Sequence, residues 1–145
     1  TALYDVIVRS MDTLGRQTGR RALVVFSDGE DQSSHITLSV AEGRVEASDA
    51  VVYTIGQGRG TRMQNLQEIL ERLARVSGGR ASFSESADRL DEAFTAIIDE
   101  LSNQYLLGYP PTNPAKDGTW RQIRVEVGGR KLNVRARQGY RAVKK

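Results

Sequence analysis

The chain of 145 residues contains no cysteine and a single histidine, His35. The absence of cysteine excludes disulfides, thiolate metal sites and a cysteine nucleophile. No run of about 18 apolar residues occurs, and the first residues lack the charged, apolar and small-residue succession of a signal peptide, so we expect no membrane span within the chain. The length is typical of one domain, which at this size buries roughly 70% of the surface that the unfolded chain exposes.

Charge is distributed unevenly along the chain, whose net charge is +3. Residues 121–145 hold nine Lys or Arg and one Glu, a balance of +8, whereas the rest holds 12 basic and 17 acidic residues, a balance of −5. A basic segment can bind nucleic acid, acidic polysaccharide or anionic lipid. Its arginines alternate with apolar residues, which is typical of the solvated face of a β-ribbon, and no RNA-binding motif is present. We therefore do not expect nucleic-acid binding.

Residues 1–104 show the pattern of an α/β domain with a Rossmann-like parallel sheet and flanking helices. Near-continuous apolar runs predict strands at 21–26 and 50–55, and a short strand is predicted at 81–84. Helical spacing of apolar residues predicts helices at 2–14, 38–47 and 87–104, and a further helix across 66–76 that ends at Gly78-Gly79. The order α-β-α-β-α-β-α implies parallel strands joined by right-handed crossovers.

Beyond residue 104 the apolar period changes to that of β-structure. Residues 105–109 are predicted to form a strand, and the proline-containing segment 110–114 a rigid loop. Alternating apolar residues over 121–127 and 132–136, joined by Gly128-Gly129, predict a β-hairpin with one wet face. Residues 105–145 are thus expected to form a small antiparallel extension packed on the domain of residues 1–104.

A carboxylate, Asp28, follows directly after the strand that ends at Phe26 and Ser27. In open parallel sheets ligands bind outside the carboxyl ends of the strands, so Asp28 is well placed to meet a cation. Magnesium prefers oxygen ligands, which suits one carboxylate combined with one hydroxyl such as that of Thr1. Two ligands alone would not hold the ion. Alternatively, Thr1 caps the following helix and Asp28-Gly29 forms an ordinary turn.

Two segments together resemble a von Willebrand factor type A (VWA) domain, in particular those of the bacterial VWFA-related domain proteins. They read Thr1-Ala2-Leu3-Tyr4-Asp5 and Val24-Val25-Phe26-Ser27-Asp28-Gly29-Glu30-Asp31. The resemblance continues through Gln104-Tyr105-Leu106-Leu107-Gly108-Tyr109 and Arg137-Gln138-Gly139-Tyr140. It therefore covers nearly the whole chain, including the C-terminal β extension.

The resemblance implies a metal-ion-dependent adhesion site (MIDAS) built from three segments. Thr1 matches the second segment and Asp28 the third, whereas the first, an Asp-x-Ser-x-Ser motif, has no match. Residues 31–35 begin like that motif, but they end in His35 and lie in the wrong loop, so we interpret them as a chance similarity. The chain is accordingly expected to be the C-terminal portion of a longer VWA protein, with an incomplete metal site in which Glu30 and Asp31 add negative potential.

By this resemblance the function is non-enzymatic protein binding of the cell-adhesion type. The intact site would hold Mg²⁺, Mn²⁺ or Ca²⁺, which accepts a carboxylate from a partner protein. The resemblance also implies a bacterial protein that is secreted or located in the cell envelope.

Two other functions remain open from the sequence. The first is a metal-independent structural or assembly module that uses the basic β extension. The second, weaker one is a nucleotide-binding domain that uses Gly56 to Gly60, although the third glycine of G-x-G-x-x-G is replaced by Thr61. A serine hydrolase is not expected, because no G-x-S-x-G motif is present.

The VWA resemblance also predicts where the strand at 21–27 lies. In the intact fold this strand would be central and would pair with a preceding strand, so without that neighbour its backbone edge would be open. An open apolar edge pairs or aggregates. We therefore expect the missing N-terminal half of the domain, or a second copy, to pair along the edge of residues 21–27.

Overall fold

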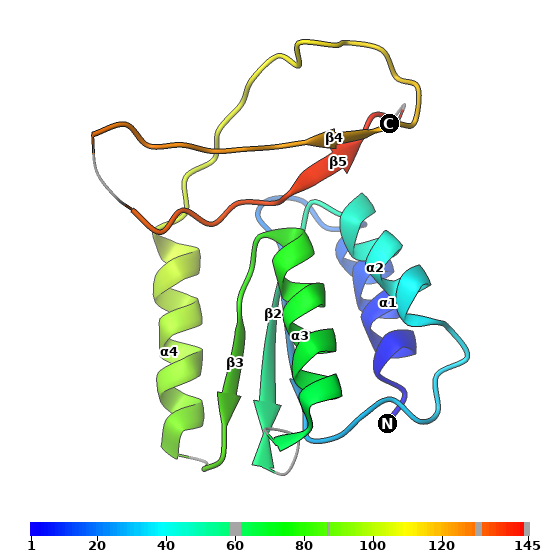
Figure 1. Cartoon of the computed structure of the whole chain (residues 1–145), viewed down its shortest axis with the longest axis vertical. Helices are drawn as coiled ribbons and strands as arrows, with labels where there is room; N and C mark the ends of the chain where they lie inside the picture. Colours follow the sequence, from blue (N-terminus) through cyan, green and yellow to red (C-terminus); the bar gives the residue numbers. More distant parts are fainter. Residues whose placement is uncertain (59–61, 87, 130–131, 144–145) are drawn as a thin grey trace.

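The computed structural model describes residues 1–58, 62–86, 88–129 and 132–143 (Figure 1). Four helices and five strands are assigned in them. The helices are α1 (Leu3–Leu14), α2 (Leu38–Ala47), α3 (Gln64–Ser77) and α4 (Asp88–Ser102). The strands are β1 (Ala22–Ser27), β2 (Val51–Gln57), β3 (Ala81–Ser84), β4 (Trp120–Gln122) and β5 (Gly139–Arg141).

The first three strands form one parallel sheet in the order β1-β2-β3. Ala22 pairs with Val51 at one end of the β1–β2 ladder and Ser27 with Gly56 at the other, while β3 pairs with the second half of β2. The central strand is the most deeply buried, because Val52 to Ile55 are fully inaccessible to solvent. These observations confirm the predicted α/β class with a Rossmann-like parallel sheet and flanking helices.

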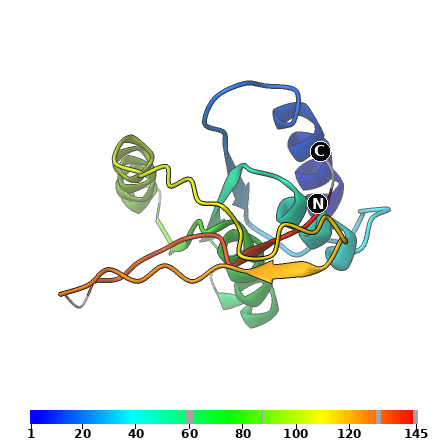
Figure 2. The ribbon, with the colours of Figure 1, turned by 90° about the horizontal axis from the view of Figure 1, so that it is seen from above.

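The helices cover the sheet from both faces (Figure 2). Side chains of α1, α2 and α3 form the larger core with one face of β1 and β2. The α4 helix packs on the opposite face, where Ile97 contacts the buried Tyr53 and Ile55 of β2. Two apolar faces explain why β1 and β2 are apolar at consecutive positions rather than at alternate ones.

The sequence signals predict the end of α3 correctly but not the start of α1. The α3 helix ends where Gly78 takes the left-handed conformation, with φ of 85°, and the Gly79 N–H bonds to the Ala74 carbonyl at 3.0 Å. This is the predicted glycine stop. At the start of α1 the N-cap residue is Ala2, which makes no side-chain cap, so the alternative in which Thr1 caps this helix is wrong.

We call residues 105–143 the appendage; it lies beyond the amino-terminal ends of the parallel strands (Figure 1). It contains the antiparallel pair β4–β5, with Arg121 opposite Tyr140, and one further bond from the Ile123 N–H to the Gln138 carbonyl at 2.8 Å. The predicted antiparallel extension is therefore present. However, the prediction of a strand at 105–109 is wrong, and so is the prediction of a strand at 132–136, because the second strand of the pair lies further on, at 139–141. The predicted strand 121–127 is paired only at its first two residues.

Close backbone packing joins the appendage to the body. A Cβ atom on Gly78 would lie 2.6 Å from the Ala136 carbonyl carbon and the Arg137 nitrogen, so only glycine permits this approach. Arg137 also donates to the Glu46 carbonyl at 2.9 Å and pairs with Asp49 at 3.2 Å. Some of the basic residues of the appendage therefore neutralise acidic residues of the body.

Among the described residues, no helix is long and apolar enough to cross a membrane.

Candidate functional site at the carboxyl end of the parallel sheet

One end of the body brings together the chain segments that most often bind ligands in parallel sheets. The strands β1, β2 and β3 all end there, and α1, α3 and α4 begin there (Figure 1). Ligand sites in open α/β sheets lie outside the carboxyl ends of the strands, and helix N-termini add positive partial charge. This end, which carries both sequence-predicted residues Thr1 and Asp28, is the candidate site.

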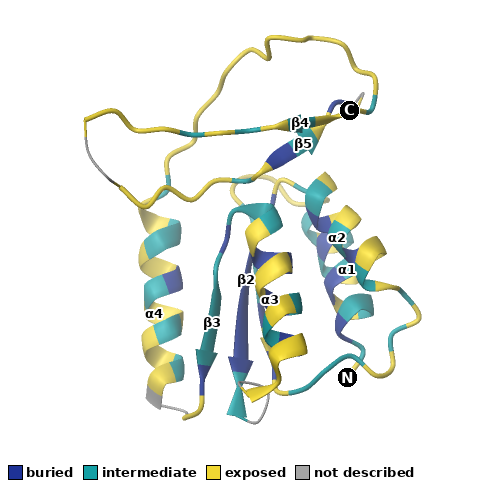
Figure 3. Ribbon diagram, viewed as in Figure 1, coloured by how far each residue is buried: buried dark blue, intermediate teal, exposed yellow. Residues whose placement is uncertain are grey.

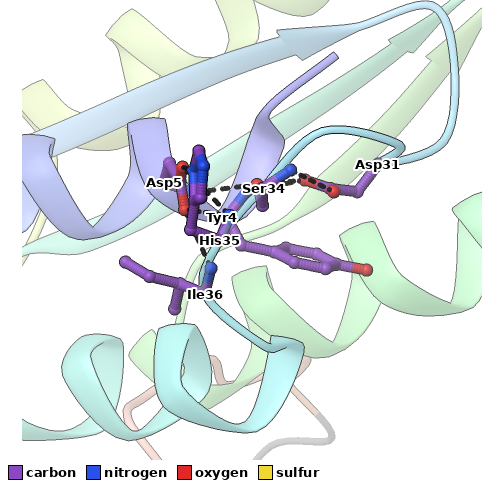
Figure 4. Close-up of polar contacts among 6 residues, drawn as sticks. All are labelled: Tyr4, Asp5, Asp31, Ser34, His35 and Ile36. Carbon is purple, nitrogen blue, oxygen red and sulfur yellow. Dashed lines mark hydrogen bonds and ion pairs between the residues drawn. The ribbon is translucent and has the colours of Figure 1, made fainter.

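The loop between β1 and α2 supplies the side chains that cap α1, although these lie about thirty residues further along the chain (Figure 4). The Ser34 hydroxyl accepts the Tyr4 N–H at 3.0 Å and the Asp5 N–H at 3.1 Å. Asp31 accepts the Tyr4 N–H at 3.1 Å, the Ser34 N–H at 3.0 Å and the Ser34 hydroxyl. Helix N-termini leave backbone N–H groups without intrahelical partners. A serine and an aspartate about thirty residues away thus satisfy those of α1.

Asp5 makes the reciprocal contact from the first turn of α1 to the same loop. Its carboxylate accepts the His35 N–H at 3.0 Å and the Ile36 N–H at 3.0 Å, and it lies 3.1 Å from His35 Nδ1. The side-chain hydrogen bond from His35, then the backbone N–H bonds, lower the pKa of Asp5 below its ordinary value. His35 itself is exposed, but its backbone N–H helps to hold the loop.

The pKa of Asp31 is also lowered. Burial would raise this pKa, but hydrogen bonds from Ser34 and from the backbone N–H of Tyr4 outweigh it. The carboxylate is therefore stabilised as an anion by groups that already occupy its oxygens. Residues 31–35, which resemble the start of the adhesion motif, use Asp31 and Ser34 for helix capping.

Thr1 and Asp28 lie at the same end of the sheet. The Thr1 carbonyl accepts the Gln32 N–H at 3.0 Å and the Ser33 N–H at 3.2 Å, which fixes Thr1 against the loop that begins at Asp28. Both residues are exposed. Across the described part of the chain, no group of three or more His, Cys, Asp or Glu side chains is arranged to hold a metal ion. The role of Thr1 and Asp28 as metal ligands stays a prediction.

Negative charge nevertheless gathers at this end. Burial raises the pKa of the Tyr4 phenol, and the nearby charges of Asp31, Glu30 and Glu42 raise it further. Glu30 is held in place by Asn65 at the start of α3, whose Nδ2 donates to it at 3.0 Å. The carboxylates of Glu30 and Asp31 therefore give this end a negative charge, which favours a cation.

In the glycine-rich segment 56–61, Gly56, the next-to-last residue of β2, has a packing role. A Cβ atom on Gly56 would come within 2.7 Å of the Phe83 ring on β3, so Gly56 makes room for that ring. Gly58 has a positive φ of 60°, and the remaining part of the glycine-rich segment, residues 59–61, lies outside the described residues. No observation here favours the nucleotide-binding alternative.

Nothing in the sequence singled out Asp5 and Ser34, which together with Asp31 organise this end. Their signal was indirect: the helix predicted over 2–14 has no capping side chain at Ala2, so its N–H groups require an acceptor from elsewhere. The sequence alone does not say which loop supplies it.

Comparison with known proteins gives a fold and no family. No protein-family model matches the sequence, and no curated protein matches it significantly. The crystal structure of an uncharacterized membrane-spanning protein from Vibrio fischeri is similar to this chain, with a TM-score of 0.50 and 20% sequence identity. The match covers 65% of this chain and 53% of that one, so the chain spans about half its length. At this identity the similarity supports the fold alone.

Proposed function

We propose that the chain is part of a VWA-like module that binds a partner protein through a divalent cation at the carboxyl end of its parallel sheet. One observation carries this proposal. The Thr1 carbonyl accepts the backbone N–H groups of Gln32 and Ser33, so the two segments that resemble the adhesion site lie at the same end of the sheet. The module catalyses no reaction in this proposal.

The chemistry of the available groups suits Mg²⁺, Mn²⁺ or Ca²⁺ in part. Thr1 offers a hydroxyl and Asp28 a carboxylate, and these cations prefer oxygen ligands. Asp5 and Asp31 are engaged with backbone N–H groups, which leaves Asp28 as the carboxylate of choice. A bound ion would supply an open coordination position for a carboxylate. The remaining ligands would come from an Asp-x-Ser-x-Ser segment, which this sequence does not contain.

The proposal extends to the environment and to a second contact. The resemblance favours a bacterial protein that is secreted or located in the cell envelope. Among the described strands β1 has a neighbour on one side only, β2, and its Phe26 is 48% exposed. An open edge of this kind favours strand addition. In the proposal the N-terminal half of the VWA domain, or a second copy, pairs along it.

The metal-binding part is tested with Mn²⁺ alone, because no partner is identified, and at high Mn²⁺ concentration, because two ligands without the Asp-x-Ser-x-Ser segment hold an ion weakly at most. Binding is followed by electron paramagnetic resonance for the wild type, Thr1→Ala and Asp28→Asn, before and after addition of EDTA. Asp91→Asn on α4 is the matched control, since Asp91 is also an exposed aspartate. We expect affinity to fall by about tenfold or more in Asp28→Asn and to stay unchanged in Asp91→Asn. Equal affinity in all variants would overturn the proposal.

A second candidate function, favoured by a different observation, is a metal-independent assembly module that uses the appendage. Tyr105, Leu106 and Leu107 are all exposed there, and Val127, Leu132 and Val134 of the β extension are exposed as well. Contiguous exposed apolar residues mark interaction surfaces. Association through this surface would persist in EDTA, whereas binding through a cation would not, which separates the two functions.

A further inference from the structure

Three segments of the appendage have the sequence pattern of strands, but in the described structure only one backbone bond, from the Ile123 N–H to the Gln138 carbonyl, pairs any of them. They are residues 105–109 and the two segments that we call the arms, residues 123–127 and 132–138. No strand is assigned within them. All three therefore retain backbone N–H and C=O groups suited to pairing with a further strand.

Residues 105–109 are the most exposed apolar segment in the described chain (Figure 3). Tyr105 is 92% exposed and Leu106 is 91% exposed, whereas Val6, an exposed apolar residue of the body, is 54% exposed. A single exposed apolar residue needs no explanation, but successive residues that bury almost nothing do. The segment therefore has the properties of a strand that lacks its sheet.

The arms provide the complementary surface. The β4–β5 pair continues to the bond between Ile123 and Gln138, and a hollow of about 380 Å³ beside it is lined by residues of both arms. Val125 and Val134 line this hollow from opposite arms. A strand placed there would extend an existing antiparallel sheet and would cover apolar side chains at the same time.

Within one chain, residues 105–109 do not run alongside the arms. Figure 1 shows that the chain leaves α4 and climbs away from the sheet, across the direction in which the arms run. Strands of one ladder lie alongside each other. Each copy thus carries an unpaired strand and an unpaired acceptor, presented in different directions.

We propose that two copies of the chain associate through the appendage, residues 105–109 of each adding as a strand to an arm of the other. The exchange is reciprocal, so one two-fold axis satisfies both strands and the assembly closes as a dimer. A second copy is the occupant because strand and acceptor are both present on every chain. This inference rests on the assembly function above and names its partner; it makes no use of Thr1, Asp28 or a cation.

Light scattering after size-exclusion chromatography tests the association. We expect the wild type to dimerise, and Leu106→Asp and Val125→Pro each to weaken the dimer by about tenfold or more. Leu106→Asp introduces charge into the strand, and Val125→Pro removes an N–H from an arm. Val6→Asp, at an exposed apolar residue of α1, is the control and should leave the dimer intact. An unchanged urea midpoint in Leu106→Asp shows that the fold survives, as its exposure predicts.

Cysteine crosslinking identifies which chain supplies the strand, and the absence of native cysteine makes the result unambiguous. Mixed single variants Leu107→Cys and Val125→Cys should form an interchain disulfide, whereas Val6→Cys with Val125→Cys should not. The double variant Leu107→Cys/Val125→Cys places both cysteines on one chain. A wild type that stays monomeric, or a double variant that crosslinks only within one chain, would overturn the inference.

All measurements are repeated in EDTA. Dimerisation that persists there supports the inference whatever the outcome for Mn²⁺ binding, so failure of the metal proposal is distinguished from failure of this one. If the wild type is monomeric but Leu106→Asp abolishes capture of another protein, the assembly function survives and the self-association does not.

Discussion

The Asp5 carboxylate, in the first turn of α1, accepts the backbone N–H of His35 at 3.0 Å and lies 3.1 Å from its ring Nδ1, although the two residues are 30 positions apart. Ser34 makes the opposite contact, from the loop to the N–H groups of Tyr4 and Asp5. The two contacts lock the start of α1 to the loop after β1. They therefore fix the end of the sheet on which Thr1 and Asp28 lie.

Removal of the Ser34 hydroxyl should destabilise this end. Ser34→Ala leaves the N–H groups of Tyr4 and Asp5 without that acceptor, and loss of a helix cap costs about 1 kcal/mol. We expect the free energy of unfolding in urea to fall by about that amount. Ser33→Ala is the control, because Ser33 contributes its backbone N–H to the Thr1 carbonyl and keeps it in the variant. Equal losses in the two variants would refute the capping role.

Stability should decrease in acid through the two capping carboxylates. The pKa values of Asp5 and Asp31 are lowered from 3.8 in the folded chain, so the folded state binds protons less readily than the unfolded one. Their contribution is fully present above the unfolded pKa and is lost as the pH falls through the folded values. Urea midpoints measured across this range should decline less steeply for Asp31→Asn than for the wild type. Parallel curves would contradict the prediction.

The opposite end of the sheet should be sensitive to alkali. Burial, and then the hydrogen bond to Glu100, raise the pKa of Tyr53 from 10.0 to about 12. The folded state thus retains the phenolic proton more strongly, and this contribution is present below pH 10.0 and is lost as the pH rises through about 12. Tyr53→Phe should flatten the decline of the unfolding free energy in this range. The pKa of Tyr4 is raised as well, so ultraviolet titration of the wild type should show late tyrosine ionisation that is reduced, but not abolished, in Tyr53→Phe.

Docking of the appendage should depend on Gly78. Its φ of 85° is unfavourable for a residue with a side chain, and a Cβ atom would meet the backbone of Ala136 and Arg137. Gly78→Ala should cost about 1 kcal/mol or more and should release the appendage to proteolysis while circular dichroism still shows the helices. Gly108→Ala is the matched control, since nothing lies within 4 Å of the corresponding Cβ position and its φ is not positive. Equal protease resistance of the two variants would exclude this role of Gly78.

The parallel body could be predicted from the sequence because its signals are local. Apolar runs of strand length alternate with segments of helical period, and this order restricts the connections to right-handed crossovers. The predicted strand at 21–26 and the glycine stop after α3 follow from such signals, and the structure contains both.

The appendage could not be predicted in the same way. Alternation over residues 121–127 reports a preference for extended backbone, but a strand exists only where a partner pairs with it. In the structure the pairing extends from Trp120 to Gln122, and residues 105–109 have no partner strand. The α1 cap was missed for a related reason: the contact between Ser34 and Tyr4 joins residues 30 positions apart, and no local pattern encodes it.

The α3 helix runs from the candidate site to the appendage, and its 14 residues make it about 21 Å long at 1.5 Å per residue. This distance exceeds roughly twice the range over which physiological salt screens a charge. Charges bound at the candidate site and at the appendage would therefore be largely screened from each other. The body thus separates the candidate site from the appendage, and any communication between ligands bound at the two has to travel through the packed helices and strands.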